Sequence, residues 1–111
     1  MKNILDGVLV VDFTQAYSGP FCTMQLADVG ATIIKIERRG VGDQSREWTP
    51  IKNGHSGYYA AINRNKKSLS LEMATPEGAE VVKRLVAKAD IVVENFKVGT
   101  LDKMGLGYED L

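Results

Sequence analysis

Two short runs of β-branched residues flank one helix-like stretch in residues 8–39, and this order constrains the fold more than any other feature of the chain. Residues 8–11 are wholly apolar, which is typical of a strand buried on both faces of a parallel sheet. A Gly-Pro pair at 19–20 supplies a turn and the fixed φ of an early helical position, and Gly30 favours the left-handed conformation that ends a helix. Residues 33–36 predict a second strand. The segment therefore predicts half of a nucleotide-binding βαβ unit.

A second helix and strand are predicted in residues 75–93. The Thr-Pro-Glu triplet at 75–77 combines a capping hydroxyl, a fixed φ and an acid that opposes the helix dipole, and the strand 91–93 follows this helix. Alternating apolar residues at 69, 71 and 73 predict one more strand. The order indicates an α/β fold with a mainly parallel sheet. Because two substantial helices leave part of such a sheet uncovered, we expect a fragment or an obligate assembly.

Composition and charge narrow the function classes. Among 111 residues, 14 basic and 14 acidic side chains cancel, so no global field favours nucleic acid or a membrane surface. The apolar runs are too short to span a bilayer, and the first residues lack the apolar core of a secretory signal. The single Cys22 excludes an internal disulfide; we expect a small buried apolar residue and a cytoplasmic location. His55 has no partners at zinc-like spacing, so we predict no metal site.

The end of the second predicted strand carries the residues that point to a ligand. Glu37 lies about where a dinucleotide-binding fold has its ribose-binding acid, but Gly19 is all that remains of the glycine fingerprint, which disfavours a plain NAD or FAD site. Arg38 and Arg39 stand where a phosphate on the adenosine ribose, as in NADP or coenzyme A, needs a fork of donors. The alternative is a pair of solvated arginines at a strand end.

Residues 40–65 show no sustained periodicity, and a short helical turn is predicted at 58–61. Asp43 and Arg46 are three residues apart, which favours a local ion pair. The cations at 64, 66 and 67 are interpreted first as a solvated loop, although beside a phosphate-binding crevice they would form a clamp for a pyrophosphate.

Several of these blocks, taken in order, resemble one family, the class III CoA-transferases. That family includes formyl-CoA and carnitine-type transferases and the related α-methylacyl-CoA racemases. The resemblance spans the whole chain. It is carried by the segments LDGVLVVDFT, SGPFCTMQLADVGATIIKIERRGVGDQSR, NRNKKSLSLEM, TPEGAEVVKRLVAKADIVVENFKVG and LDKMGLGYEDL.

The resemblance implies a Rossmann-like N-terminal domain that binds CoA, a smaller second domain, and a homodimer of interlocked chains. Residues 1–111 would be the N-terminal part of the CoA-binding domain, with an incomplete sheet, and the second domain and catalytic segment would lie outside them. The partners would be an acyl-CoA and a carboxylic acid, with CoA as the only cofactor.

The resemblance also implies a set of CoA-binding positions. Tyr17 and Ser18 would line the site after the first strand, and Arg38 would contact the adenosine end. Lys103 stands where many relatives have arginine, so an ammonium replaces a bidentate fork. Two further stretches would border the path of CoA, namely Leu71, Glu72, Met73 and Ala74, and Asn95, Phe96 and Lys97.

The covalent chemistry of the family is not implied for any residue of this chain. In the transferases an aspartate carboxylate attacks the acyl-CoA, and acyl anhydride and aspartyl-CoA intermediates follow. No aspartate here matches it, so the chain alone is expected to be inactive. The alternatives are the corresponding domain of an acyl-CoA racemase and a non-catalytic CoA- or nucleotide-binding module. Because Tyr17 replaces the glutamine of formyl-CoA transferases, specificity for formate and oxalate is not implied.

Overall fold

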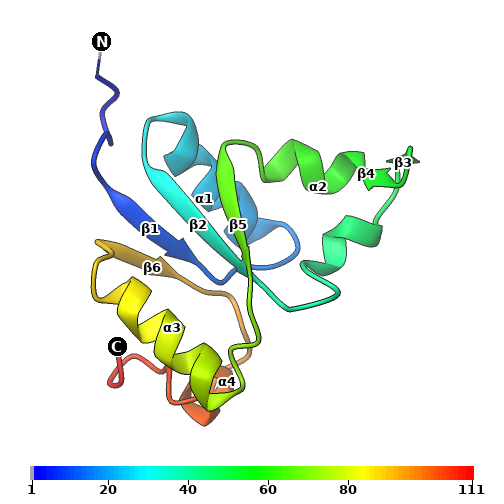
Figure 1. Cartoon of the computed structure of the whole chain (residues 1–111). Helices are drawn as coiled ribbons and strands as arrows, with labels where there is room; N and C mark the ends of the chain where they lie inside the picture. Colours follow the sequence, from blue (N-terminus) through cyan, green and yellow to red (C-terminus); the bar gives the residue numbers. More distant parts are fainter. Residues whose placement is uncertain (1) are drawn as a thin grey trace.

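The computed structural model describes residues 2–111 and contains one four-stranded parallel sheet (Figure 1). Its strands are β1 (Leu9–Asp12), β2 (Thr32–Glu37), β5 (Lys66–Ser70) and β6 (Ile91–Val93), in the spatial order β5-β2-β1-β6. All the pairings in this sheet are parallel. A dinucleotide-binding sheet likewise places its first strand between the second and the fourth. The expected α/β, Rossmann-like fold is confirmed.

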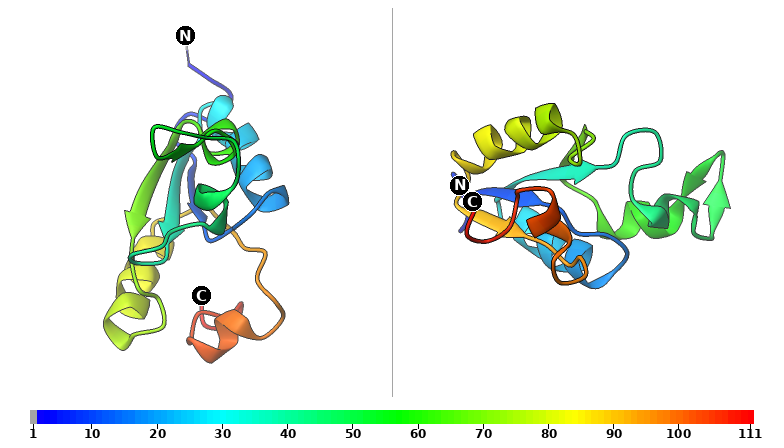
Figure 2. Two further views of the ribbon diagram at one scale, coloured as in Figure 1. Left: turned by 90° about the vertical axis from the view of Figure 1, so that its right-hand side faces the viewer. Right: turned by 90° about the horizontal axis from the view of Figure 1, so that it is seen from below.

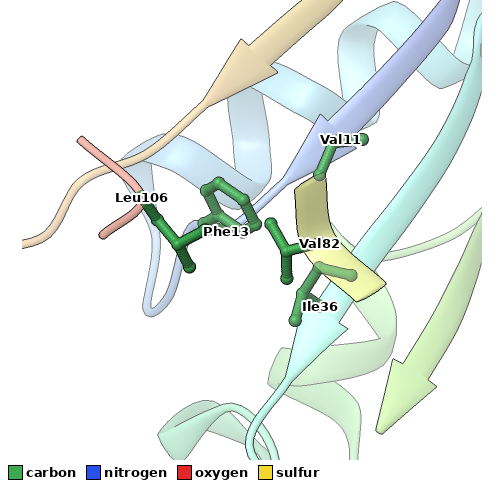
Figure 3. Close-up of a cluster of buried hydrophobic side chains, with 5 residues drawn as sticks. All are labelled: Val11, Phe13, Ile36, Val82 and Leu106. Atoms are coloured by element: carbon green, nitrogen blue, oxygen red, sulfur yellow. The ribbon is translucent and has the colours of Figure 1, made fainter. Parts of the chain in front are cut away.

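Helices cover both faces of the sheet (Figure 2). On one face, α1 (Ser18–Asp28) packs over a small apolar cluster that includes Val10 and Ile33. On the other face, α3 (Pro76–Val86) contributes Val82 to the main core. Figure 3 shows Phe13 of this core lying between Val82 and Leu106, so the segment after β1 and the C-terminal segment share one core.

The two long helices begin by different means. At α3, the Thr75 hydroxyl accepts a hydrogen bond of 3.1 Å from the Gly78 N–H, as the capping triplet predicts. At α1, the capping residue is Tyr17, and its side chain makes no capping bond. Past the end of α1, Gly30 has a φ of +111°, which agrees with the predicted helix stop.

The strand predicted from alternating residues lies three residues earlier in the structure, in β5 (Lys66–Ser70). Leu69, Leu71 and Met73 all pack against the core on the α3 side, so the alternation continues past the end of the strand. The Leu71 N–H still donates to the Glu37 carbonyl oxygen at 2.9 Å. The pattern identified the buried side chains rather than the strand boundaries.

The segment between β2 and β5 contains small elements. They are the 3₁₀ turn η1 (Gln44–Glu47), a hairpin of β3 (Ile51–Lys52) and β4 (His55–Ser56), and the helix α2 (Gly57–Ile62). The helical turn predicted at 58–61 lies within α2 and is confirmed. Near the C-terminus, α4 spans Thr100–Lys103. Within residues 2–111, no helix combines the length and apolar character that crossing a membrane requires.

Candidate functional site

The carboxyl ends of the four parallel strands meet at one edge of the sheet, where folds of this kind bind their ligands. Phe13, Arg38, Leu71 and Glu94 follow the ends of β1, β2, β5 and β6. The expected CoA-binding positions at 17–18, 38, 71–74 and 95–97 therefore all follow strand ends. Lys103 is the exception because it lies at the end of α4.

Beneath α1, this end of the sheet is filled with charged side chains. The Lys66 ammonium lies 3.1 Å from Asp12 Oδ2, and the Lys35 ammonium lies 2.9 Å from Asp43 Oδ2. Burial lowers the pKa of Lys66, and the Asp12 carboxylate opposes this. Thr23 donates a further bond of 2.6 Å to Asp12. Buried charges persist only when paired and hydrogen-bonded, so these contacts fix the geometry beneath the candidate site.

The three cations considered as a pyrophosphate clamp do not act together. Only 2% of the Lys66 side chain is exposed, and its ammonium also donates to the Pro20 carbonyl oxygen at 2.9 Å. Arg64 pairs with Asp28 at the surface, Nη2 to Oδ2, at 2.7 Å. Neither the clamp nor a solvated loop describes this cluster, because the backbone turns Lys66 inward while Lys67 stays exposed.

The Glu37 carboxylate is fully engaged by its own chain. It accepts from Arg46 Nε at 2.7 Å and Nη2 at 2.8 Å, and from the Tyr59 hydroxyl at 2.6 Å. Ser68 and the Asp43 N–H each donate at 2.9 Å. Burial opposes ionisation, but the bonds from Arg46 and Tyr59 hold the pKa of Glu37 at about 2. Glu37 therefore has no free lone pairs for a ribose, and the predicted local pair of Arg46 with Asp43 is wrong.

Arg38 and Arg39 retain free guanidinium groups at the end of β2. Both are exposed, and neither takes part in an ion pair within the part of the chain that the structure describes. A hollow of about 260 Å³ opens here, and its lining includes Arg38, Arg46 and Ser70. Arg38 is the free cation that borders this hollow among the described residues, and a free guanidinium beside a hollow fits a phosphate group.

Tyr17 and Ser18 are exposed at the start of α1. The Tyr17 ring stacks on Phe21 with 5.6 Å between ring centroids and lies 6.2 Å from the Tyr58 ring. Trp48 packs edge-on against Tyr58 at 4.9 Å. Tyr17 thus belongs to a group of aromatic side chains. The sequence pattern did not reveal this group, because its residues come from separate elements.

The stretch 71–74 is divided between core and surface. Leu71 and Met73 pack against the main core, whereas Ala74 is exposed. The Ala74 N–H donates to the Glu72 carboxylate at 3.3 Å, which holds the turn before α3. A ligand along this stretch would therefore meet the backbone and the side chains at 72 and 74.

The stretch 95–97 holds a neighbouring loop. Asn95 Oδ1 accepts from the Gln15 N–H at 2.9 Å, and Asn95 Nδ2 donates to the Gln15 carbonyl oxygen at 2.8 Å. Phe96 packs against the main core. Lys97 and Lys103 are exposed. Lys97 borders a second hollow, of about 790 Å³, along the β6 edge, whereas Lys103 is absent from its lining. The CoA-binding roles of all these residues stay predictions.

The structure corrects the expectation for Cys22 and shows a buried charge, Lys35, that the sequence analysis did not consider. Cys22 is exposed rather than buried, because it lies on the outer side of the first turns of α1. Lys35 sits inside the apolar run of β2 and is buried. The sequence signal for its burial is that Lys35 stands between two isoleucines in a predicted strand. A lysine buried in this way needs an acidic partner. In residues 2–111, no group of three or more His, Cys, Asp or Glu side chains is placed to hold a metal ion.

The sheet order and the free arginines at the end of β2 define an α/β domain of the Rossmann class with a candidate phosphate site. The model of CoA-transferase family III matches residues 5–111. The chain therefore belongs to CoA-transferase family III, which confirms the resemblance found in the sequence.

Named relatives and a solved structure agree with this assignment. Succinyl-CoA:glutarate CoA-transferase of Homo sapiens is 48% identical over 114 residues, an alignment that covers 100% of this chain and 26% of the relative. Formyl-CoA:oxalate CoA-transferase of Bradyrhizobium sp. (strain ORS 278) is 46% identical over 112 residues, with the same coverage. A CAIB/BAIF family protein from Brucella suis superposes with a TM-score of 0.91 at 43% identity, covering 99% of this chain and 30% of that one. The chain thus spans about a quarter of these curated relatives.

Proposed function

We propose that this chain is the CoA-binding part of a class III CoA-transferase, which moves CoA from an acyl-CoA to a carboxylic acid. The family match over residues 5–111 supports this proposal. The described residues would bind and orient CoA. We propose that no aspartate of this chain is the nucleophile that forms the anhydride and the aspartyl-CoA thioester.

One observation carries the proposal. At the end of β2, the acid that would bind a ribose is engaged by Arg46 and Tyr59, while the next residue, Arg38, is free and borders a hollow. This arrangement disfavours a ligand recognised through bare ribose hydroxyls. It favours one that carries phosphate on the ribose, as CoA does.

We further propose a short dicarboxylate as acceptor and succinyl-CoA as donor. The relatives include succinyl-CoA:glutarate CoA-transferase of Homo sapiens and succinyl-CoA:mesaconate CoA-transferase of Haloarcula hispanica, the latter 46% identical over 112 residues. A homodimer is proposed on family grounds. The racemase and the binding module are not proposed, because no specific observation favours either.

Calorimetric titration tests the cofactor site. The protein is expressed from its complete native reading frame and titrated with CoA and with CoA that lacks the 3′-phosphate. We expect Arg38→Ala to weaken CoA binding roughly tenfold, since one charge-assisted contact with the 3′-phosphate is lost. The same substitution should weaken binding of the dephosphorylated form by much less. Arg84→Ala, which removes an exposed guanidinium from α3, is the matched control and should change neither affinity.

Two results would contradict the proposal. No CoA binding by the unsubstituted protein would remove the cofactor role altogether. An equal loss of affinity for both ligands in Arg38→Ala would show that Arg38 does not read the 3′-phosphate. Exchange of CoA between succinyl-CoA and a series of dicarboxylates then tests the acceptor class.

A further inference from the structure

Three consecutive residues of the loop between β1 and α1 are each held through the backbone by a side chain from elsewhere. Lys35 donates to the Thr14 carbonyl oxygen at 2.9 Å. Asn95 bonds to both the N–H and the carbonyl oxygen of Gln15, at 2.9 and 2.8 Å. The next N–H, that of residue 16, donates to Asp43 Oδ1 at 3.2 Å. The loop is thus held by Lys35 from β2, by Asn95 from the segment after β6 and by Asp43, which caps η1.

The Lys35–Asp43 ion pair that contacts this loop is itself held in place by burial and hydrogen bonds. The Lys35 and Asp43 side chains are 1% and 0% exposed, with 2.9 Å between Lys35 Nζ and Asp43 Oδ2. Asp43 Oδ1 also accepts from the N–H and the hydroxyl of Ser45, at 2.9 and 2.8 Å. Burial disfavours the Asp43 carboxylate, but the Ser45 N–H and Lys35 hold its pKa below the usual value. The pair therefore offers the loop a fixed acceptor and a fixed donor.

The loop adopts a conformation that needs such support. Ala16 has a φ of +71°, in the left-handed region that residues with a Cβ avoid, and it immediately precedes Tyr17. Such a backbone persists where the surrounding structure over-determines it. Here the surrounding contacts are those of Asn95 and the Lys35–Asp43 pair, so the conformation of the residues before Tyr17 and Ser18 depends on three side chains that lie outside the loop.

We propose that Asn95 and the Lys35–Asp43 pair are positioning residues that preorganise this loop, so that Tyr17 and Ser18 meet CoA without prior ordering. The proposal rests on the proposed function, because CoA is the ligand that the loop would meet. It gives Asn95 a different role from a direct contact with CoA, since both polar atoms of its side chain are already bonded to Gln15. A preorganised loop binds more tightly because less conformational freedom is lost on binding.

Hydrogen–deuterium exchange with mass spectrometry, combined with CoA titration, tests this role in the protein from its native reading frame. In Asn95→Ala, we expect exchange in the peptide that covers residues 13–18 to rise roughly tenfold, because two hydrogen bonds are lost. Exchange in α3 should not change, and CoA affinity should fall severalfold. Gln25→Ala is the control: it removes an exposed amide from α1 for which no hydrogen bond is found among residues 2–111.

Asp43→Asn is the second variant, because it keeps the oxygen that accepts from the Ala16 N–H while abolishing the charge opposite Lys35. It should also raise loop exchange and weaken CoA binding. Unchanged exchange in Asn95→Ala, or faster exchange with unchanged affinity, would overturn the positioning role alone. Absence of CoA binding by the unsubstituted protein would instead overturn the proposed function, so the two failures are separable.

Discussion

Glu37 and Arg46 meet in a two-point contact, with 2.7 Å from Arg46 Nε to Glu37 Oε2 and 2.8 Å from Nη2 to Oε1. The contact joins the end of β2 to η1. Tyr59 of α2 joins it from a third element through its hydroxyl, and the Arg46 guanidinium lies 4.0 Å from the centroid of its ring. Glu37, which stands where a ribose-binding acid is expected, thus anchors the segment that follows β2.

The first prediction concerns the dependence of stability on pH. The pKa of Glu37 falls from 4.5 to about 2 on folding, which corresponds to roughly 3 kcal/mol of stability. Because the folded pKa is the lower one, this contribution is complete above pH 4.5 and is lost as the pH falls towards 2. Glu37→Gln should therefore reduce the free energy of unfolding by roughly that amount at pH 7 and by less than half of it at pH 3.

Urea unfolding at both pH values measures this difference. Glu80→Gln is the control, because Glu80 lies on the exposed side of α3 and forms a surface ion pair with Arg84. A Glu37→Gln deficit of the same size at pH 3 and pH 7 would show that the ionised carboxylate is not the source of the stability.

The second prediction separates geometry from charge at Arg46. Arg46→Lys keeps the positive charge but replaces two directed bonds and the ring contact with one ammonium. We expect a loss of about 1–2 kcal/mol, because the Arg46 side chain is 43% exposed and solvent screens part of the interaction. Urea unfolding at pH 7 checks this, with Arg84→Lys on α3 as the control. Full retention of stability would mean that charge alone suffices.

Apolar patterning predicted the architecture because burial on both faces leaves a clear trace in the sequence. The run 8–11 and the buried residues of 33–36 correspond to β1 and β2, and the Thr75 cap begins α3 where expected. The pattern was less reliable for β5, since Leu71 and Met73 are buried after the strand has ended. The apolar pattern therefore predicts which side chains face the core better than it predicts where a strand begins and ends.

The candidate site was predicted only in part, for a physical reason. Strand order brings residues 17–18, 38, 71–74 and 95–97 to one edge, which the βαβ pattern anticipates. The partners of charged and polar side chains were not predictable, because they lie far apart in the sequence. Lys66 reaches Asp12, and Asn95 reaches Gln15, across 54 and 80 positions. Local spacing instead suggested a pair of Asp43 with Arg46 that does not form.

The third prediction distinguishes a structural lysine from a ligand-binding one. Lys66→Met leaves the Asp12 carboxylate buried without its cation, so we expect a loss of roughly 3 kcal/mol in the free energy of unfolding. CoA affinity should change less than about twofold, since the ammonium faces the protein interior. The neighbouring exposed Lys67, changed to Met, is the control for stability. Reduced CoA affinity with unchanged stability in Lys66→Met would restore the pyrophosphate clamp.

The fourth prediction concerns the first turn of α1. At Gly19, a Cβ atom would overlap the Cβ of Thr14, whose backbone N–H and hydroxyl both donate to Asp12. Thr14 is fully buried and its hydroxyl is bonded to Asp12, so we expect Gly19→Ala to displace either the loop or the start of the helix. We expect a loss of about 1–3 kcal/mol in stability, as for an overpacked core. CoA affinity should fall as well, because Ser18 and Tyr17 move with the loop.

Gly57→Ala is the matched control, because its new Cβ would lie 3.3 Å from the nearest atom, Pro50 Cγ, at the start of α2. That contact needs only a small adjustment, so the stability should change by less than about 0.5 kcal/mol. Urea unfolding and CoA titration of both variants make the comparison. Equal stability and equal CoA affinity for Gly19→Ala and the unsubstituted protein would mean that Thr14 moves aside freely. In that case the loop before α1 is not held by its bonds to Asp12.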